Sequence, residues 1–217
     1  VNAAKTLVDK LRPKDRMAIV TDDVALLVDF TRDKAKLKKA LESLKVKAQT
    51  IPEHSEQFSA LLATIRELFD EEDIRPIIIF QTDGDQIIFL QPPDPLLSVG
   101  HPRSRITKFS LADVYAATER SRATVYTVIP GFRLIGLPKA DQLERAKIDL
   151  ERFMISNGFG GDYLSRQPYH PSKKAVSDSL DFRLKGQLAA AGVAKLTGGW
   201  TSFLEQPEQA AAIYESI

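Results

Sequence analysis

A short segment, Thr82-Asp83-Gly84-Asp85, combines two carboxylates with a glycine directly after an apolar run. The run, from Ile77 to Phe80, contains three β-branched residues in succession, which is typical of a strand buried on both faces. In open α/β sheets, ligands and metal ions bind outside the carboxyl ends of such strands. Asp83 stands at that position, where a carboxylate can bind a metal ion or contact a partner. Asp-Gly is also a common turn sequence, so both interpretations remain open.

The composition limits the kinds of function that this chain can have. Its 217 residues are 43% hydrophobic and 27% charged, with a formal net charge of +1, which is typical of a folded domain without a general attraction for polyanions. The absence of cysteine excludes disulfides, zinc–thiolate sites and thiol catalysis, and it leaves the cellular compartment open. No apolar run approaches the roughly 20 residues of a membrane-spanning helix. We therefore expect neither a nucleic-acid partner nor a membrane span in this chain.

Helices and strands are expected to alternate along most of the chain, as in a sheet that presents Asp83 at its edge. The spacing of apolar residues predicts helices, with Thr31, Ser55 and Ser110 as N-caps, over 3–11, 32–44, 56–69, 111–122, 140–155, 180–196 and 207–217. Short apolar segments predict strands over 16–21, 24–30, 77–80, 123–129 and 200–203, the first two forming a hairpin. This order predicts a mostly parallel sheet with helices on both faces and one antiparallel edge strand.

Two insertions are expected at the carboxyl ends of these strands. The first, 86–107, contains apolar residues that we expect to be exposed: Ile87, Ile88, Phe89, Leu96 and Leu97. The second, 130–179, contains the helix over 140–155, whose apolar stripe needs a surface to pack on. Because parallel strands end at one edge, both insertions should flank Asp83, where they either cover the edge or form a rim that selects a partner.

Four segments occur in a characteristic order: L-V-D-K-L-R-P-K-D-R-M-A-I-V-T, V-A-L-L-V-D-F-T-R-D, I-I-I-F-Q-T-D-G-D and A-K-L-T-G-G-W-T-S-F. In this order they resemble the von Willebrand factor A (VWFA) domain, and most closely its bacterial VWFA-related type. The resemblance implies a single domain over 1–217 with a three-layer, doubly wound, Rossmann-like fold. It also implies that the third segment carries, at Asp83, the metal-site aspartate of the family's fourth strand.

The metal-ion-dependent adhesion site (MIDAS) of this family is matched only in part. The family's first strand ends in an Asp-x-Ser-x-Ser loop and lies between the strands that match 16–21 and 76–81. Nothing in this sequence matches it, so we expect an N-terminally incomplete domain with a gap in the sheet. The resemblance implies Asp83 and Ser55 as ligands, with Glu56 as a close alternative to Ser55 and Thr50 further away. The implied ion is Mg²⁺, which prefers hard oxygen ligands, with one position completed by a partner's carboxylate.

Other polar residues are interpreted as structural. Asp85 and either Asp22 or Asp23 are expected at the same edge as Asp83, as turn residues that make this edge acidic. The three histidines lie in predicted loops without a common metal-ligand spacing and are expected on the surface: His54, His101 and His170.

These observations favour a non-enzymatic module that binds a partner protein at the carboxyl edge of its sheet. The family resemblance is also compatible with an extracytoplasmic location. The alternative is an enzyme, because Asp83-Gly84-Asp85 after an apolar strand resembles the nucleophile loop of haloacid-dehalogenase-type phosphatases. In that loop one aspartate attacks phosphorus and the second acts as a general acid. Gln86 stands where that family has threonine or valine, and two strands precede the motif, which both argue against this alternative.

Overall fold

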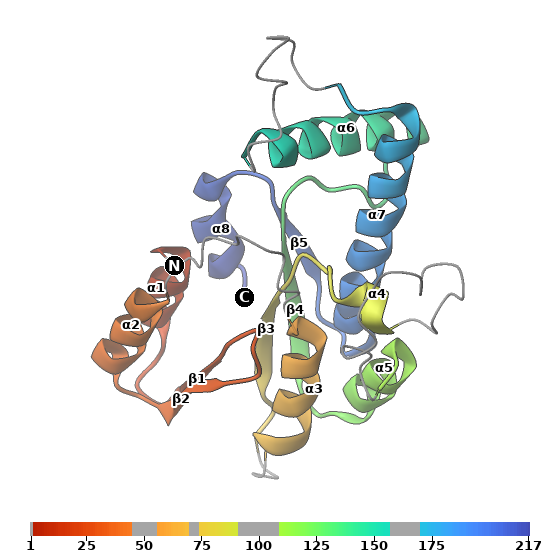
Figure 1. The fold of residues 1–217 in the computed structure, drawn as a ribbon. Helices are drawn as coiled ribbons and strands as arrows, with labels where there is room; N and C mark the ends of the chain where they lie inside the picture. Colours follow the sequence, from red (N-terminus) through yellow and green to blue (C-terminus); the bar gives the residue numbers. More distant parts are fainter. Residues whose placement is uncertain (1, 45–55, 70–73, 91–108, 157–169) are drawn as a thin grey trace.

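The structure, a computed structural model, describes residues 2–44, 56–69, 74–90, 109–156 and 170–217. Its strands form two separate sheets (Figure 1). β1 (Met17–Val20) pairs antiparallel with β2 (Leu26–Thr31), whereas β3 (Ile77–Gln81), β4 (Thr124–Pro130) and β5 (Thr201–Leu204) form a parallel sheet in that order. The predicted α/β class is confirmed. The hairpin forms its own sheet, so the prediction that it adds an antiparallel edge strand to the parallel sheet is wrong for the described residues.

Helices pack against both sheets (Figure 1). They are α1 (Asn2–Lys10), α2 (Lys34–Ser43), α3 (Gln57–Glu67), α4 (Ile87–Leu90), α5 (Leu111–Arg120), α6 (Lys139–Ser156), α7 (Lys173–Leu196), the 3₁₀ helix η2 (Pro207–Gln209) and α8 (Ala210–Glu215). α7 begins at Lys173, well before the predicted start at Leu180, because the Ser172 side chain caps it by accepting a hydrogen bond from Ala175 N. The sequence did not predict α4.

Both faces of the parallel sheet contact helices. One face packs against α3, α5 and α7 in a core that includes Phe58, Leu61, Phe80, Val114, Val125, Ala189 and Val193. The other face packs against α8 and α1, through Val128, Tyr214, Leu7 and Ile79. β4 is the central strand, and its residues Val125 and Val128 point to opposite faces of the sheet. Both are fully buried because helices cover both faces.

β3 is the edge strand of the parallel sheet, although its apolar sequence predicts burial on both faces. Its backbone pairs with β4 from Ile77 opposite Thr124 to Gln81 opposite Val128. Phe80 is 7% exposed, whereas Ile77 is 58% exposed. Among the described residues, the other side of β3 has no strand partner and lies toward the β1–β2 hairpin, where a gap was expected (Figure 1).

The hairpin has a small core of its own with α1 and α2. This core consists of Val8, Ile19, Val28, Leu37 and Leu41. α2 begins after Asp33, whose side chain accepts a hydrogen bond of 3.0 Å from Lys36 N. The predicted cap Thr31 is instead the last residue of β2, so that prediction is wrong by two positions.

The Thr197-Gly198-Gly199 turn joins α7 to β5 and presses against β4. Gly198 has φ +73°, which confirms the predicted C-terminal glycine. The Thr197 hydroxyl accepts a hydrogen bond from Val125 N, and a Cβ on Gly199 would lie 1.9 Å from Val125 O. The turn therefore requires glycine at position 199 to let β4 and β5 pair.

Candidate functional site

The loop 82–86, which follows β3, is fixed at the carboxyl edge of the sheet. Thr82 is buried, and its N–H donates to Val128 O, which continues the β3–β4 pairing by one step. Gly84 N donates to the Thr82 hydroxyl at 3.0 Å, and Gly84 O accepts from Ile87 N at the start of α4. Asp83 is exposed between these two buried residues. The segment therefore forms the predicted turn, and Asp83 lies at the predicted position beyond the carboxyl end of β3.

Gln57, the first residue of α3, connects that helix to the loop. Its Nε2 donates to Asp83 Oδ1 at 2.9 Å, while its Oε1 accepts from the Thr82 hydroxyl. Asp85 N also donates to Asp83 Oδ1, at 3.2 Å. The Asp83 carboxylate thus lies beside the N-terminus of α3, where the partial positive charge of the helix favours an anion. The hydrogen bonds from Gln57 and Asp85 N fix the orientation of this carboxylate.

Gln86 caps α3 from outside the helix. The predicted cap Ser55 lies outside the described residues, and Glu56 makes no side-chain capping bond. Instead, Gln86 Oε1 accepts from Phe58 N at 2.6 Å and from Ser59 N at 3.2 Å, while Gln86 Nε2 donates to the Ser59 hydroxyl at 2.7 Å. Gln86 is 1% exposed, so it satisfies backbone groups that would otherwise be buried without partners.

The loop also rests on α7 through a contact between two glycines. A Cβ on Gly84 would lie 2.6 Å from the Gly186 backbone, and a Cβ on Gly186 would lie 2.9 Å from Gly84 O. Gly84 further has φ +80°, a conformation that other residues rarely adopt. Ile87 and Leu90 of α4 continue this contact inward and are 2% and 3% exposed. The expectation that Ile87 is exposed is therefore wrong.

The tip of the hairpin reaches the same edge. Asp22 O accepts a hydrogen bond of 2.8 Å from Glu56 N, the residue before Gln57. Asp23 accepts from the Thr21 hydroxyl within the turn. The expectation that Asp22 and Asp23 are turn residues at the Asp83 edge agrees with this arrangement.

The described residues at this edge do not by themselves fit a Mg²⁺ site. No three His, Cys, Asp or Glu side chains of the described ranges lie close enough together to hold a metal ion. The Asp83 carboxylate is bound by an amide and a backbone N–H, and Ser55 lies outside the described residues. His170 is on the surface as expected, with 75% of its side chain exposed, while His54 and His101 fall outside the described residues.

The carboxyl ends of β4 and β5 carry a second group of charged side chains that the sequence analysis missed. Glu205, just after β5, accepts from Arg133 N at 2.9 Å and from Arg145 Nη1 at 2.6 Å. The backbone N–H of Arg133 and the nearby Arg145 hold the pKa of the Glu205 carboxyl below its usual range. Gln187 of α7 fixes the loop after β4, because its side chain accepts from Leu134 N and donates to Phe132 O.

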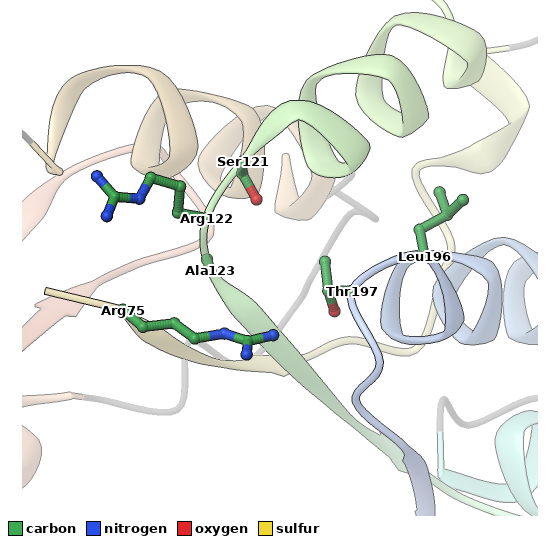
Figure 2. A pocket seen from close by; sticks show the side chains of 6 residues that line it. All are labelled: Arg75, Ser121, Arg122, Ala123, Leu196 and Thr197. Carbon is green, nitrogen blue, oxygen red and sulfur yellow. The ribbon is translucent and has the colours of Figure 1, made fainter. Parts of the chain in front are cut away.

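An open pocket of about 380 Å³ lies at the opposite, amino edge of the sheet. It is lined by Arg75, Ser121, Arg122, Ala123, Leu196 and Thr197. Figure 2 shows the Arg75 side chain extending toward Thr197, whereas the Arg122 side chain points away from it. Helices α5 and α7 both end at this pocket, and their partial negative charge disfavours an anion between the two arginines. The better candidate site is therefore the carboxyl edge.

Comparison with known proteins supports the fold. A crystal structure of an aerotolerance-related membrane protein from Bacteroides fragilis NCTC 9343, with multiple mutations to serines, is 14% identical over 100% of this chain and 83% of that chain, with a TM-score of 0.50. The conserved hypothetical protein BatB from Bacteroides thetaiotaomicron is 15% identical over 99% of this chain and 82% of its own, with a TM-score of 0.52. No protein-family model and no curated protein matches the sequence.

At 14% and 15% identity, the likeness to these two structures shows the fold alone. The first of them is described as a membrane protein. In the part of this chain that the structure describes, none of the helices combines the length and the apolar character needed to cross a bilayer.

Proposed function

We propose that this chain is a VWFA-related domain that binds a partner protein through the carboxyl edge of its parallel sheet. Four local sequences resemble that family, and the fold resembles that of the two crystal structures described above. The observation that carries the proposal is a row of charged side chains at the strand ends: Asp83 after β3, Arg133 after β4 and Glu205 after β5.

The fold orients these groups before any partner arrives. Gln57 and Asp85 N bind the Asp83 carboxylate, and Arg133 N and Arg145 bind the Glu205 carboxylate. Association costs less conformational entropy when interface side chains are already ordered. Charged groups in fixed positions also decide which partners fit, because a wrong charge pairing is repelled. Both properties suit a binding surface.

The proposal does not depend on a metal ion. The Asp83 carboxylate is already hydrogen-bonded to Gln57, and no three acidic or histidine side chains of the described residues come together around it. Mg²⁺ dependence is therefore a separate prediction, implied by the family resemblance, and it is tested by adding Mg²⁺ or a chelator to the binding assay below.

Capture of partners from a native lysate tests the proposal. We expect the intact chain to retain specific proteins that Asp83→Ala loses, because Asp83 is an exposed group on the proposed surface. Glu119→Ala is the matched control, since Glu119 is an exposed carboxylate near the opposite edge of the sheet. A third variant replaces 91–108 with a short turn, which leaves the structural residues Gln86, Ile87 and Leu90 in place. If Asp83→Ala and Glu119→Ala retain the same proteins in the same amounts, the proposal is wrong.

The phosphatase alternative stays a prediction with its own test. In that chemistry Asp83 is the nucleophile, so any phosphatase activity of the intact chain should disappear in Asp83→Asn. Hydrolysis of a chromogenic phosphate monoester that requires Asp83 would replace the binding proposal.

A further inference from the structure

Two arginines of α6 lie over one phenylalanine at the carboxyl edge. Phe132 follows β4, and its ring centre is 5.6 Å from the guanidinium carbon of Arg145 and 5.0 Å from that of Arg152. The two arginines are seven residues apart, so two helical turns place them on the same face of α6. Figure 1 shows α6 lying across the end of the sheet from which the loop after β4 leaves. We call Phe132, Arg133, Arg145 and Arg152 the arginine patch.

Two of the three arginines in the patch form no ion pair with the described residues. Glu205 pairs with Arg145 and with the backbone of Arg133. The Arg133 guanidinium donates through Nε to Ile135 O and lies 6.0 Å from the Phe203 ring, and it forms no ion pair with the described residues. Arg152 likewise forms no ion pair within the described ranges. The guanidinium groups of Arg133 and Arg152 therefore have no carboxylate partner among the described residues, whereas that of Arg145 has one.

Aromatic contacts explain only part of this arrangement. Contacts between a guanidinium and an aromatic ring stabilise a protein by about 0.5–1 kcal/mol at exposed sites, so they account for Arg145 and Arg152 as packing groups. They do not give Arg133 and Arg152 an anionic partner. A partner that brings carboxylates would supply one. Arginine suits such a partner because its planar fork binds a carboxylate through two parallel hydrogen bonds.

The neighbouring residues favour a peptide over a nucleic acid. Ile155, one turn beyond Arg152 on α6, is 64% exposed and offers an apolar contact beside the charges. A continuous phosphate backbone along this edge would also meet the carboxylates of Asp83 and Glu205, whereas a peptide can place its acidic side chains at Arg133 and Arg152 alone. The net charge of the whole chain is +1, far below what nucleic-acid binding by general attraction requires.

We infer that the arginine patch is the part of the partner surface that binds an acidic segment, with carboxylates on Arg133 and Arg152 and an apolar side chain beside Ile155. The inference rests on the proposed function, since it names the chemistry of the partner bound at the same edge. Arg145 contacts both Glu205 and the Phe132 ring and so holds these two residues in position.

Fluorescence anisotropy with two labelled peptides tests this directly. One peptide alternates aspartate and glutamate with leucine, and the other replaces each acid by its amide. The proteins are the intact chain, the double variant Arg133→Gln/Arg152→Gln, and Arg122→Gln as a matched control. Arg122 is an exposed arginine at the opposite edge. Circular dichroism and thermal unfolding verify that all variants fold alike.

We expect the acidic peptide to bind more tightly than its amide counterpart. The double variant should weaken the acidic peptide about tenfold, as for the loss of two exposed charge-assisted contacts, while Arg122→Gln should leave it unchanged. Binding should also weaken as ionic strength rises from about 0.05 to about 0.3 M. Three results would each overturn the inference. They are equal binding of the two peptides, equal losses of binding in the double variant and in Arg122→Gln, and tighter binding of a single-stranded oligonucleotide than of the acidic peptide.

The lysate experiment separates this inference from the proposed function. If the double variant loses peptide binding but keeps the proteins that depend on Asp83, the acidic-partner inference fails and the proposed function stands. If no captured protein depends on Asp83 but the acidic peptide still binds through Arg133 and Arg152, the proposed function fails. The patch is then a site for acidic peptides that does not belong to an Asp83-dependent surface.

Discussion

Replacing Gly186 by alanine tests whether α7 holds the Asp83 loop in place. Gly186 is buried in α7, and a Cβ there would lie 2.9 Å from Gly84 O and 3.1 Å from the Gly84 carbonyl carbon. These are backbone atoms of a loop that is also tied to β4 and α3, so it cannot turn aside as a flexible side chain would. The methyl group therefore has to push the loop away from the helix.

Two opposing effects determine how much Gly186→Ala changes the free energy of unfolding. Alanine stabilises a helix interior by about 0.5–1 kcal/mol relative to glycine. Overpacking against immobile atoms costs about 1–3 kcal/mol. The clash should exceed the gain in helix propensity, so we expect Gly186→Ala to lower the free energy of unfolding by about 1–2 kcal/mol.

Gly192→Ala is the matched control in the same helix. A Cβ there would lie 2.5 Å from the Tyr115 hydroxyl, which donates to Ala189 O, so this substitution also crowds a neighbour, but one that is not part of the Asp83 loop. Urea unfolding followed by the fluorescence of Trp200, the single tryptophan, compares the two variants. We expect both variants to lose stability, but amide shifts around Asp83 to change only in Gly186→Ala. A Gly186→Ala variant as stable as the intact chain, with an unchanged Asp83 loop, would refute the close contact between loop and helix.

Two further predictions concern single side chains of the edge. Gln86→Ala should lower the free energy of unfolding by about 1–3 kcal/mol, because it leaves buried N–H groups of α3 without acceptors. Gln142→Ala, which removes one half-buried hydrogen bond, should cost less in the same urea titration, and equal losses would contradict the capping role. The lowered pKa of Glu205 means that its stabilisation is complete above its ordinary value of 4.5 and is lost as pH falls through the lower folded value. Glu205→Gln should therefore be less stable than the intact chain at neutral pH, and the difference in stability should disappear below the lowered pKa of Glu205. A difference in stability that does not depend on pH would contradict the ion pairing.

Local patterns were predicted well because they depend on neighbouring residues. Ser110 caps α5 as expected, since a serine followed three residues later by Asp113 forms a reciprocal capping box. The hydrogen bonds from the Ser110 backbone and hydroxyl lower the pKa of Asp113. The position of Asp83 also followed from sequence, because an apolar run before Asp-Gly marks the end of a strand.

Contacts between distant segments were not predicted. Gln86 binds Phe58 N across 28 positions of sequence, and no local pattern indicates that a glutamine after a turn caps another helix. The arginine patch forms because α6 returns over the loop after β4, which brings Phe132 beneath Arg145 and Arg152. The spacing of seven between these arginines was the one available signal, and it says nothing about what they face. Ile87 was assigned to an exposed insertion because the packing of α4 on α7 is likewise a tertiary contact.

Two adjacent residues of α7 determine how the charged edge is arranged. Gly186 contacts the loop that carries Asp83, and Gln187 binds Phe132 O and Leu134 N on either side of Arg133. The negative group after β3 and the positive group after β4 are thus fixed to one helix, and their separation is set by it. A partner that contacts both meets charges at a preset spacing, which favours selection by charge pattern over selection by buried area.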